Sequence, residues 1–314
     1  MITPGVDLGP RLLTGLARSV LVLWVALTLV FLALRVLPGD AVSGTLIEAS
    51  ATDIRARREQ LGLDDPYAEQ YLRYLSNLLQ GDLGYSLITS ERVSDMIGAR
   101  LLPTLSLGLA SFGVAIALGL LLGLGNGLNG PVWLSAATGF FITISQAIPF
   151  YVTALLAIHL ISVQLDWLPA SGSQTPSHLI LPALTLGFHT AGAIARVLSA
   201  NLQDTYRQPY ILAARAKGLA PIDLLDHALR IAILPTLGVV AIQAGFILGG
   251  SVILEVLFVR RGLGTLLYQS VLNRDYPVVQ ALTLLGALLY LLANGTSSVA
   301  RYTLDPRLRE VRTA

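Results

Sequence analysis

No Lys, Arg, Asp or Glu occurs between Arg100 and Asp166, a run of 65 residues. A membrane-spanning helix needs roughly 20 apolar residues, because the hydrocarbon core is about 30 Å thick and a helix rises about 1.5 Å per residue. One helix cannot use the whole run, and residues 126–131 (Asn-Gly-Leu-Asn-Gly-Pro) form a dense turn signal. The run therefore predicts two spans, near 101–125 and 133–163, and Pro149 is expected to kink or interrupt the second.

Four more stretches are long and poor in charge, and each predicts a further span. They lie near 16–37, 179–200, 231–254 and 276–300. The first is too long for an ordinary signal-peptide core and is not followed by a small-x-small cleavage site, so we expect an uncleaved span. Only 13% of the residues are charged, whereas soluble domains carry about 25%. The sequence therefore predicts an all-α integral membrane protein with six transmembrane helices.

Glycines recur at four-residue spacing within two of these spans, as Gly119, Gly123 and Gly127 and again as Gly245 and Gly249. Small residues on one face let helices approach closely in lipid. We interpret both stripes as packing positions of a multi-helix bundle.

The distribution of cationic residues predicts the orientation of the chain. Six spans place both termini on one side, and with the termini inside, eleven Lys and Arg residues fall inside against three in the short outside loops. The positive-inside rule therefore favours cytoplasmic termini. The predicted organisation is an N-terminus and first helix (1–37), an extracytoplasmic segment (38–100), a five-helix core (101–303) with a cytoplasmic loop (201–230), and a cytoplasmic tail (304–314).

The extracytoplasmic segment is expected to be partly helical. Asp65-Pro66 is a cap followed by a first-turn proline, aromatic and leucine side chains follow at helical spacing from Tyr67 to Leu78, and Gly81 can close the helix. Packing of this stripe on the spans is the simpler interpretation, and contact with an external partner is the alternative.

The predicted cytoplasmic loop contains a short helix signal. Pro209 can begin a helix that runs to Lys217, Gly218 is a natural C-terminal stop, and Pro221 can begin the next helix. Such an alanine-rich, basic helix suits the cytoplasmic surface of a membrane protein. Spacing alone, however, favours a solvated connecting loop.

Motifs along nearly the whole chain resemble those of one transporter family. Residues 213–219 (Ala-Ala-Arg-Ala-Lys-Gly-Leu), followed by Ile233-Leu234-Pro235, resemble the coupling-loop motif of ABC importer membrane subunits. Within these subunits the chain is most similar to the dipeptide/oligopeptide/nickel permease family. The other matching segments are Leu37–Asp40, Leu61–Pro66 with Gln70-Tyr71, Gly81–Gly84, Leu179–Leu186, Arg274–Gln280 and Leu304–Arg307.

The resemblance implies a type I importer permease in the bacterial cytoplasmic (inner) membrane. It implies a second related permease subunit, two ATP-binding cassette ATPase subunits and an external solute-binding protein as partners, with lipid around the spans. ATP and Mg²⁺ would bind on the ATPase, and this chain would hold no cofactor. The residues that would dock on the ATPase are Tyr210, Ala213, Ala214, Arg215, Ala216, Lys217 and Gly218.

The chain itself shows no recognisable catalytic or metal site. A P-loop needs Gly-Lys followed by Ser or Thr, and Lys217, the only lysine, is followed by Gly218. His159 and His189 fall inside predicted spans, where a histidine is a functional candidate but is more often polar glue between helices. Glu255 resembles a family position close to the outer gate. These three residues are the candidates for a gate or pathway, and a net charge of +2 does not suggest nucleic acid.

Three functions compete on the sequence. The ordered motifs favour an ABC importer permease for peptides, and import of nickel or a metal chelate by the same mechanism is the alternative. A secondary transporter or channel acting alone would predict inverted repeats and charged or broken mid-span segments, of which only Pro149 is a candidate. A membrane enzyme would need a nucleophile or metal constellation, and none is recognisable.

Overall fold

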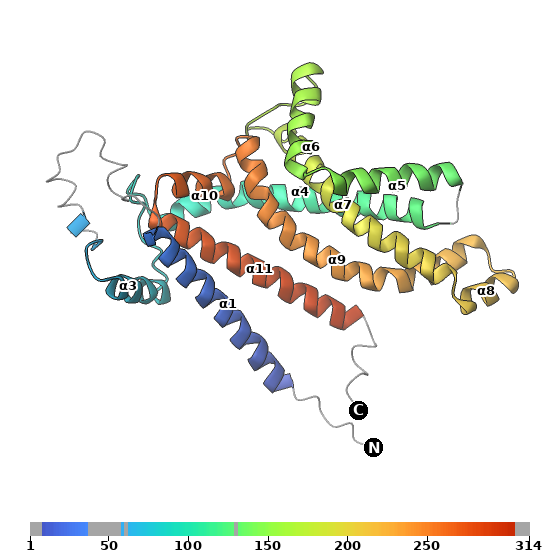
Figure 1. The fold of residues 1–314 in the computed structure, drawn as a ribbon, viewed down its shortest axis with the longest axis horizontal. Coiled ribbons are helices and arrows are strands. Elements are labelled where there is room, and N and C mark those ends of the chain that lie inside the picture. Colours follow the sequence, from blue (N-terminus) through green and yellow to red (C-terminus); the bar gives the residue numbers. More distant parts are fainter. Residues whose placement is uncertain (1–7, 37–57, 60–61, 129–130, 305–314) are drawn as a thin grey trace. The chain divides into compact units, whose positions relative to one another are not determined.

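The computed structural model describes residues 8–36, 58–59, 62–128 and 131–304. Within these ranges the chain is helical, and its β pairing is limited to an isolated bridge between Tyr85 and Arg92 (Figure 1). The chain divides into unit 1, residues 1–100 with 266–291, and unit 2, residues 101–265 with 292–314. The predicted motifs at 37–40 and 305–307, and the predicted tail beyond residue 304, lie outside the described residues.

All six segments predicted to span the membrane are helical. Four helices are long and apolar enough to cross a bilayer: α1 (Leu8–Val36), α4 (Val93–Gly127), α7 (Ser177–Tyr206) and α9 (Pro221–Leu257). The pair of α5 (Val132–Ala147) with α6 (Phe150–Ala157) and η1 (Ile158–Gln164) makes a fifth if it counts as one span. The sixth prediction corresponds to α11 (Tyr276–Leu304), in which Tyr276–Leu292 is a shorter apolar helix. By length and composition the described chain thus has four to five spans.

Pro149 interrupts the predicted span at 133–163, as expected. The α5 helix ends at Ala147, Ile148 is extended with φ −97° and ψ 125°, and α6 begins at Phe150. A proline disfavours helical geometry in the residue before it and cannot donate a backbone hydrogen bond. The two arms meet at 104°, which is a sharper break than an ordinary proline kink.

In unit 1, α3 (Tyr67–Leu79) packs on α1. The ring centroid of Phe31 lies 5.0 Å from that of Tyr71 and 6.0 Å from that of Tyr74. The hydroxyls of Thr28 and Tyr71 are 2.6 Å apart. The stripe therefore packs on a span in part, as predicted, although Tyr67 at its start is 61% exposed.

Both ends of α3 follow their sequence signals closely. Pro66 is the N-cap rather than the first helical residue, a shift of one position. At the other end Gly81 has φ +77°, and the N–H groups of Gly81 and Asp82 donate to the carbonyls of Leu78 and Asn77. This is the Schellman arrangement that a glycine stop predicts.

A buried carboxylate ties the loop after α3 to α11. Asp275, which is 2% exposed, precedes α11 and accepts hydrogen bonds from the Ser86 hydroxyl at 2.5 Å and the Leu87 N–H at 3.0 Å. Buried carboxylates need such donors to offset the loss of hydration. The loop and the first turn of α11 are therefore held together within unit 1.

In unit 2, α7 is the central helix and packs against α9, α5 and α6 (Figure 1). It also contacts α4 at the predicted glycine stripe: a Cβ at Gly119, Gly123 or Gly127 would lie 2.9–3.0 Å from side chains of α7. The stripe is thus a close-packing face, as expected. A Cβ at Gly249 would meet nothing within 4 Å, so Gly249 of the second stripe makes no such contact among the described residues.

Candidate functional site

The segment predicted to couple to an ATPase is a helix, α8 (Pro209–Ala216). Pro209 occupies its first turn and Gln208 before it is extended, as the fixed φ of proline favours. Ile211 is fully buried and joins a cluster with Leu198 and Leu202 of α7 and Leu224 of α9. The solvated loop that spacing alone favoured is therefore wrong: the segment is a helix with an anchored face.

Gly218 closes α8 in the left-handed conformation, with φ +80°. The Gly218 N–H donates to the carbonyl of Arg215, and the Leu219 N–H donates to that of Ala214. These two bonds form a Schellman motif, and Ala214 and Leu219 both pack against the same apolar cluster. The geometry fixes where α8 ends and turns the chain toward α9.

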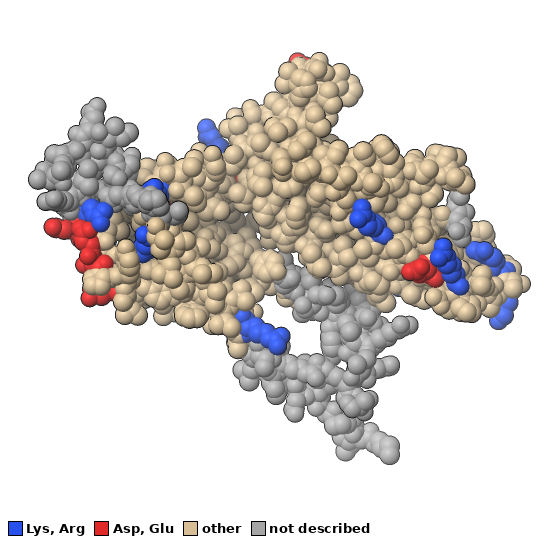
Figure 2. Space-filling view, viewed as in Figure 1, with Lys and Arg blue, Asp and Glu red and all other residues tan. Residues whose placement is uncertain are grey.

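The opposite face of α8 is open. Tyr210 is 46% and Leu212 is 51% exposed, and Ala213, Arg215, Ala216 and Lys217 are also exposed. Figure 2 shows Lys and Arg side chains gathered around this end of unit 2. The short helix thus has one buried side chain and a basic, partly apolar outer face that is accessible to another protein.

Glu255 is the centre of a second cluster in unit 2. Its side chain is fully buried near the end of α9. One carboxylate oxygen accepts a hydrogen bond from the Thr104 hydroxyl at 2.6 Å, and the other accepts from the N–H groups of Gly264 at 2.6 Å and Thr265 at 3.3 Å. Thr104 in turn accepts from the Leu263 N–H at 2.8 Å. The carboxylate thus caps the start of α10 (Leu263–Leu272), where helix N–H groups favour an anion.

The glycines beside Glu255 are required by its position. A Cβ at Gly262 would collide with the carboxyl group, and a Cβ at Gly264 would lie 2.5 Å from the Cα of Val252. A larger residue at either place would displace the carboxylate from its donors. The two glycines of Gly262-Leu263-Gly264 therefore allow the end of α9 and the start of α10 to pack closely.

Arg260 lies in the same loop and is 5% exposed. Its guanidinium donates to the carbonyl of His178 at 3.0 Å, and its backbone N–H donates to the carbonyl of Glu255 at 2.8 Å. Burial lowers the pKa of Arg260, while the charge of Glu255 acts to raise it. Arg260 therefore joins the loop to the start of α7, whereas Arg261 is exposed.

The two candidate histidines have different surroundings. His189 of α7 stacks on Phe246 with centroids 5.4 Å apart and lies 5.9 Å from Phe150. Gln146, just before the break at Pro149, donates to the carbonyl of His189 at 2.7 Å. His159 lies on η1, exposed, with its Nε2 3.2 Å from the amide nitrogen of Gln164. No group of three His, Cys, Asp or Glu side chains suited to a metal occurs among the described residues.

The sequence did not indicate several of the residues that form these buried hydrogen bonds. Thr104 stands within the uncharged run, where a single hydroxyl carries no signal. Asp275 stands inside a motif shared with the family, but the motif gave it no role. The contact between Thr104 and Glu255 joins positions 151 residues apart, and spacing along the chain does not indicate such contacts.

Known proteins resemble this chain over most of its length. Residues 115–310 match the family described as binding-protein-dependent transport system inner membrane component. The glutathione transport system permease protein GsiC of Escherichia coli (strain K12) is 38% identical over 291 residues, which cover 91% of this chain and 94% of that protein. The protein of the same name from Pectobacterium atrosepticum is 37% identical over 299 residues, which cover 95% of this chain and 97% of that protein.

Solved structures show the same fold. The inward-facing MetNI methionine ABC transporter matches with a TM-score of 0.54 and 20% identity over 67% of this chain and 96% of that chain. An amino acid ABC transporter matches with a TM-score of 0.51 and 19% identity over 68% and 94%. At these identities the likeness concerns the fold alone.

The family match spans more than half of the chain, and the relatives span nearly all of it. The family match and the apolar helices together identify the chain as a multi-pass protein of the inner membrane. Membership also implies an ATPase and a binding protein as partners. The chain therefore belongs to the binding-protein-dependent transport system inner membrane components, as an ABC importer permease of type I fold in the dipeptide/oligopeptide/nickel family.

Proposed function

We propose that this permease imports short peptides, glutathione or peptides of similar size, and that α8 couples it to a separate ATPase. The names of its relatives support the choice of cargo. The observation that carries the coupling role is the two-sided build of α8: Ile211 fixes one face, while Arg215 and Lys217 stand exposed near its end. Because one face of α8 is packed on α7 and α9, a displacement that another subunit applies to its exposed face is transmitted to these two helices.

The proposed assembly contains this chain, a second related permease, two ATPase subunits and an external binding protein. ATP and Mg²⁺ bind on the ATPase subunits, and this chain carries no catalytic residue. The termini and α8 face the cytoplasm, and the segment 38–100 faces outward. Closure of the ATPase pair around ATP moves α8 and switches the permease pair between inward-open and outward-open states.

We further propose that Glu255 belongs to the outer gate. Its carboxylate joins α9, Thr104 of α4 and the start of α10, so a movement of α9 is passed to the loop at 258–265. His189, between Phe150 and Phe246, lies beside the break at Pro149 and is the proposed pathway residue. His159 is the weaker pathway candidate, because it is exposed on η1.

The test is recovery of the chain from its native membrane in mild detergent, with identification of every subunit that accompanies it. We expect a second permease and an ATPase in stoichiometric amounts. Recovery of the chain alone, from an extraction that keeps other such complexes intact, would favour a transporter or channel that acts by itself. Uptake of labelled glutathione, a dipeptide and Ni²⁺ by cells with and without the chain then separates peptide cargo from metal cargo.

A further inference from the structure

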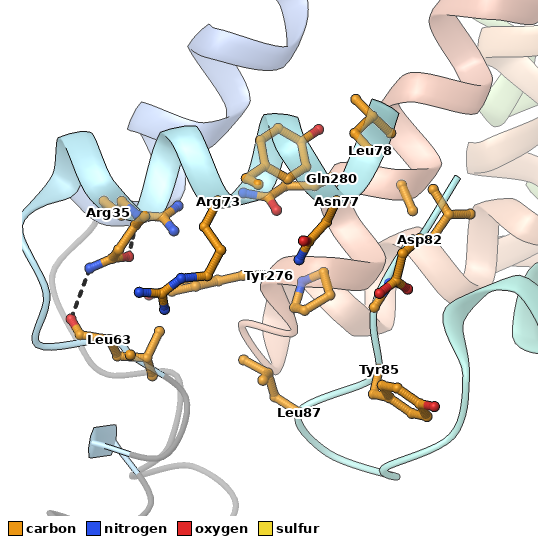
Figure 3. Close-up of a pocket in the computed structure, with 17 residues that line it drawn as sticks. Arg35, Leu63, Arg73, Asn77, Leu78, Asp82, Tyr85, Leu87, Tyr276 and Gln280 are labelled. Atoms are coloured by element: carbon orange, nitrogen blue, oxygen red, sulfur yellow. Dashed lines mark hydrogen bonds between the residues drawn. The ribbon is translucent and has the colours of Figure 1, made fainter. Parts of the chain in front are cut away.

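One side of α3 is turned toward the rest of unit 1. It lines a cavity of about 280 Å³ at the end of α1, and Figure 3 shows Arg73 and Asn77 pointing from the helix into this space. On the adjoining side Tyr71 packs on Phe31 of α1, with ring centroids 5.0 Å apart. The residues of α3 that line the cavity are Gln70, Arg73, Tyr74, Asn77 and Leu78. This part of the surface of α3 is therefore occupied within unit 1.

Another face of α3 is apolar and uncovered. It is a stripe of Ala68, Leu72, Leu75 and Leu79, which follow one another at spacings of three or four residues. Leu72 is 66% and Leu79 is 90% exposed, Ala68 is exposed, and Leu75 is half-buried. Successive residues of a helix are about 100° apart around its axis, so the stripe lies roughly opposite the residues that line the cavity. The side chains between these two faces are polar and exposed: Glu69, Ser76 and Gln80.

Contacts with α1 show the level at which α3 lies. The candidate span in α1 ends at Val36, and Arg35, one residue before this end, donates to the side chain of Gln70 at 3.0 Å. The Tyr71 hydroxyl lies 2.6 Å from that of Thr28, eight residues before Val36, which corresponds to about 12 Å along the helix axis. The α3 helix thus lies beside the last turns of the span and not beyond them (Figure 1).

The surroundings at this level are apolar. On α1, Leu29 is 61% and Leu32 is 45% exposed, as expected for residues of a membrane span that face lipid. Tyr67, at the start of α3, is 61% exposed, and tyrosines are enriched where membrane and water meet. Single exposed leucines on a protein surface need no explanation, whereas an uncovered stripe beside a membrane span does.

We infer that α3 is an interfacial helix, whose stripe from Ala68 to Leu75 is immersed in the edge of the lipid layer and reaches water at Leu79. Helices of this kind bury their apolar face about 5–10 Å into the boundary between headgroups and acyl chains, which agrees with the contact at Thr28. The partner of the stripe is membrane lipid. An external protein meets the polar side of α3 instead, at Glu69 and Ser76.

The experiment measures which solvent each face of α3 meets. The chain contains no cysteine, so a bimane fluorophore can be attached to single cysteines in the purified full-length chain in nanodiscs. Iodide quenches the fluorophore from water, and lipids with brominated acyl chains quench it from the bilayer. The variants form two matched pairs, Ala68→Cys with Glu69→Cys and Leu75→Cys with Ser76→Cys. The members of a pair are adjacent, so they lie at the same level of the helix but about 100° apart around it.

In each pair we expect iodide to quench the label on the stripe severalfold less than its neighbour, and brominated lipid to quench it severalfold more. Leu29→Cys, at a position 61% exposed on α1, gives the value for a residue that faces lipid. Equal quenching of the two labels of a pair, by either quencher, would overturn the inference and leave the stripe open to an external protein.

The pair at Ala68 and Glu69 decides if the substitution at the half-buried Leu75 disturbs the fold, because both of its positions are exposed. Both faces of a nanodisc are open to water, so the result does not depend on which side of the membrane α3 occupies. The measurement also needs neither an ATPase nor a cargo. Its failure would therefore leave the co-purification and uptake results standing, and their failure would leave the quenching result unaffected.

Discussion

At the scale of single residues, buried carboxylates hold together parts of each unit that are distant in sequence. Glu255 serves three donors and Asp275 serves two. Each carboxylate is fully or almost fully buried, so its donors offset a desolvation cost that would otherwise destabilise the fold. Substitutions that keep the shape but change the acceptors should therefore be informative.

Glu255→Gln should lower the thermal stability of the purified chain. The amide has one acceptor oxygen, so it cannot serve both Thr104 and the N–H of Gly264, and one buried donor is left unsatisfied at a cost of about 1–3 kcal/mol. Gly262→Ala should act in the same direction, because its Cβ would displace the carboxylate. Thermal unfolding in detergent checks this, with Glu91→Gln at an exposed site as the matched control. Transition temperatures equal to that of the control would contradict the role of Glu255.

Asp275→Asn should loosen the loop at 82–92 without unfolding the chain. The substitution removes a charged acceptor shared by Ser86 and Leu87, and local opening governs the exchange of backbone amides. We expect amide exchange in this loop to accelerate about tenfold, corresponding to about 1.4 kcal/mol. Ser86→Ala should also accelerate exchange in this loop, because the Ser86 hydroxyl donates to Asp275 and accepts from the N–H groups of Ile88 and Thr89. Deuterium exchange followed by mass spectrometry measures both variants, and unchanged exchange in Asp275→Asn would count against the assignment.

At the scale of elements, the sequence predicted where helices lie better than how they meet. Uncharged runs, the turn at 126–131 and the prolines at 149, 209 and 221 located the helices, because each acts locally on backbone geometry or hydration. The 104° angle after Pro149 depends on packing against α7, as does the burial of Ile211. The residues proposed for coupling were identified through a motif, whereas Thr104 carries no signal until α4 and α9 are brought together.

The end of α8 is the element on which coupling should depend. Gly218→Ala places a Cβ at φ +80°, which costs about 1–2 kcal/mol and should fray the helix end while leaving some ATP-dependent uptake. Gly218→Trp adds a bulky side chain at the same strained position, and Lys217→Glu reverses a charge on the exposed face. Both should abolish uptake with normal insertion in the membrane, because Ile211 still packs α8 on α7 and α9. Uptake and membrane content are measured together, with Glu91→Lys as a charge-reversal control. Normal uptake by both Gly218→Trp and Lys217→Glu would refute the coupling role.

At the scale of the whole molecule, the orientation in the membrane decides what each site can meet. The coupling role requires α8 in the cytoplasm, where ATP is available, and contact with an external binding protein requires the segment 38–100 on the other side. The chain contains no cysteine, so single cysteines can be introduced without removing a background. We expect Leu79→Cys, at a position 90% exposed on α3, to react with an impermeant maleimide in right-side-out spheroplasts. Ala213→Cys on α8 should react only after the membrane is opened. Labelling of Ala213→Cys from outside would reverse the topology and remove the basis for the coupling helix. The expected pattern would place α3 outside and α8 in the cytoplasm, as required of an importer that receives its ligand outside and is driven by an ATPase inside.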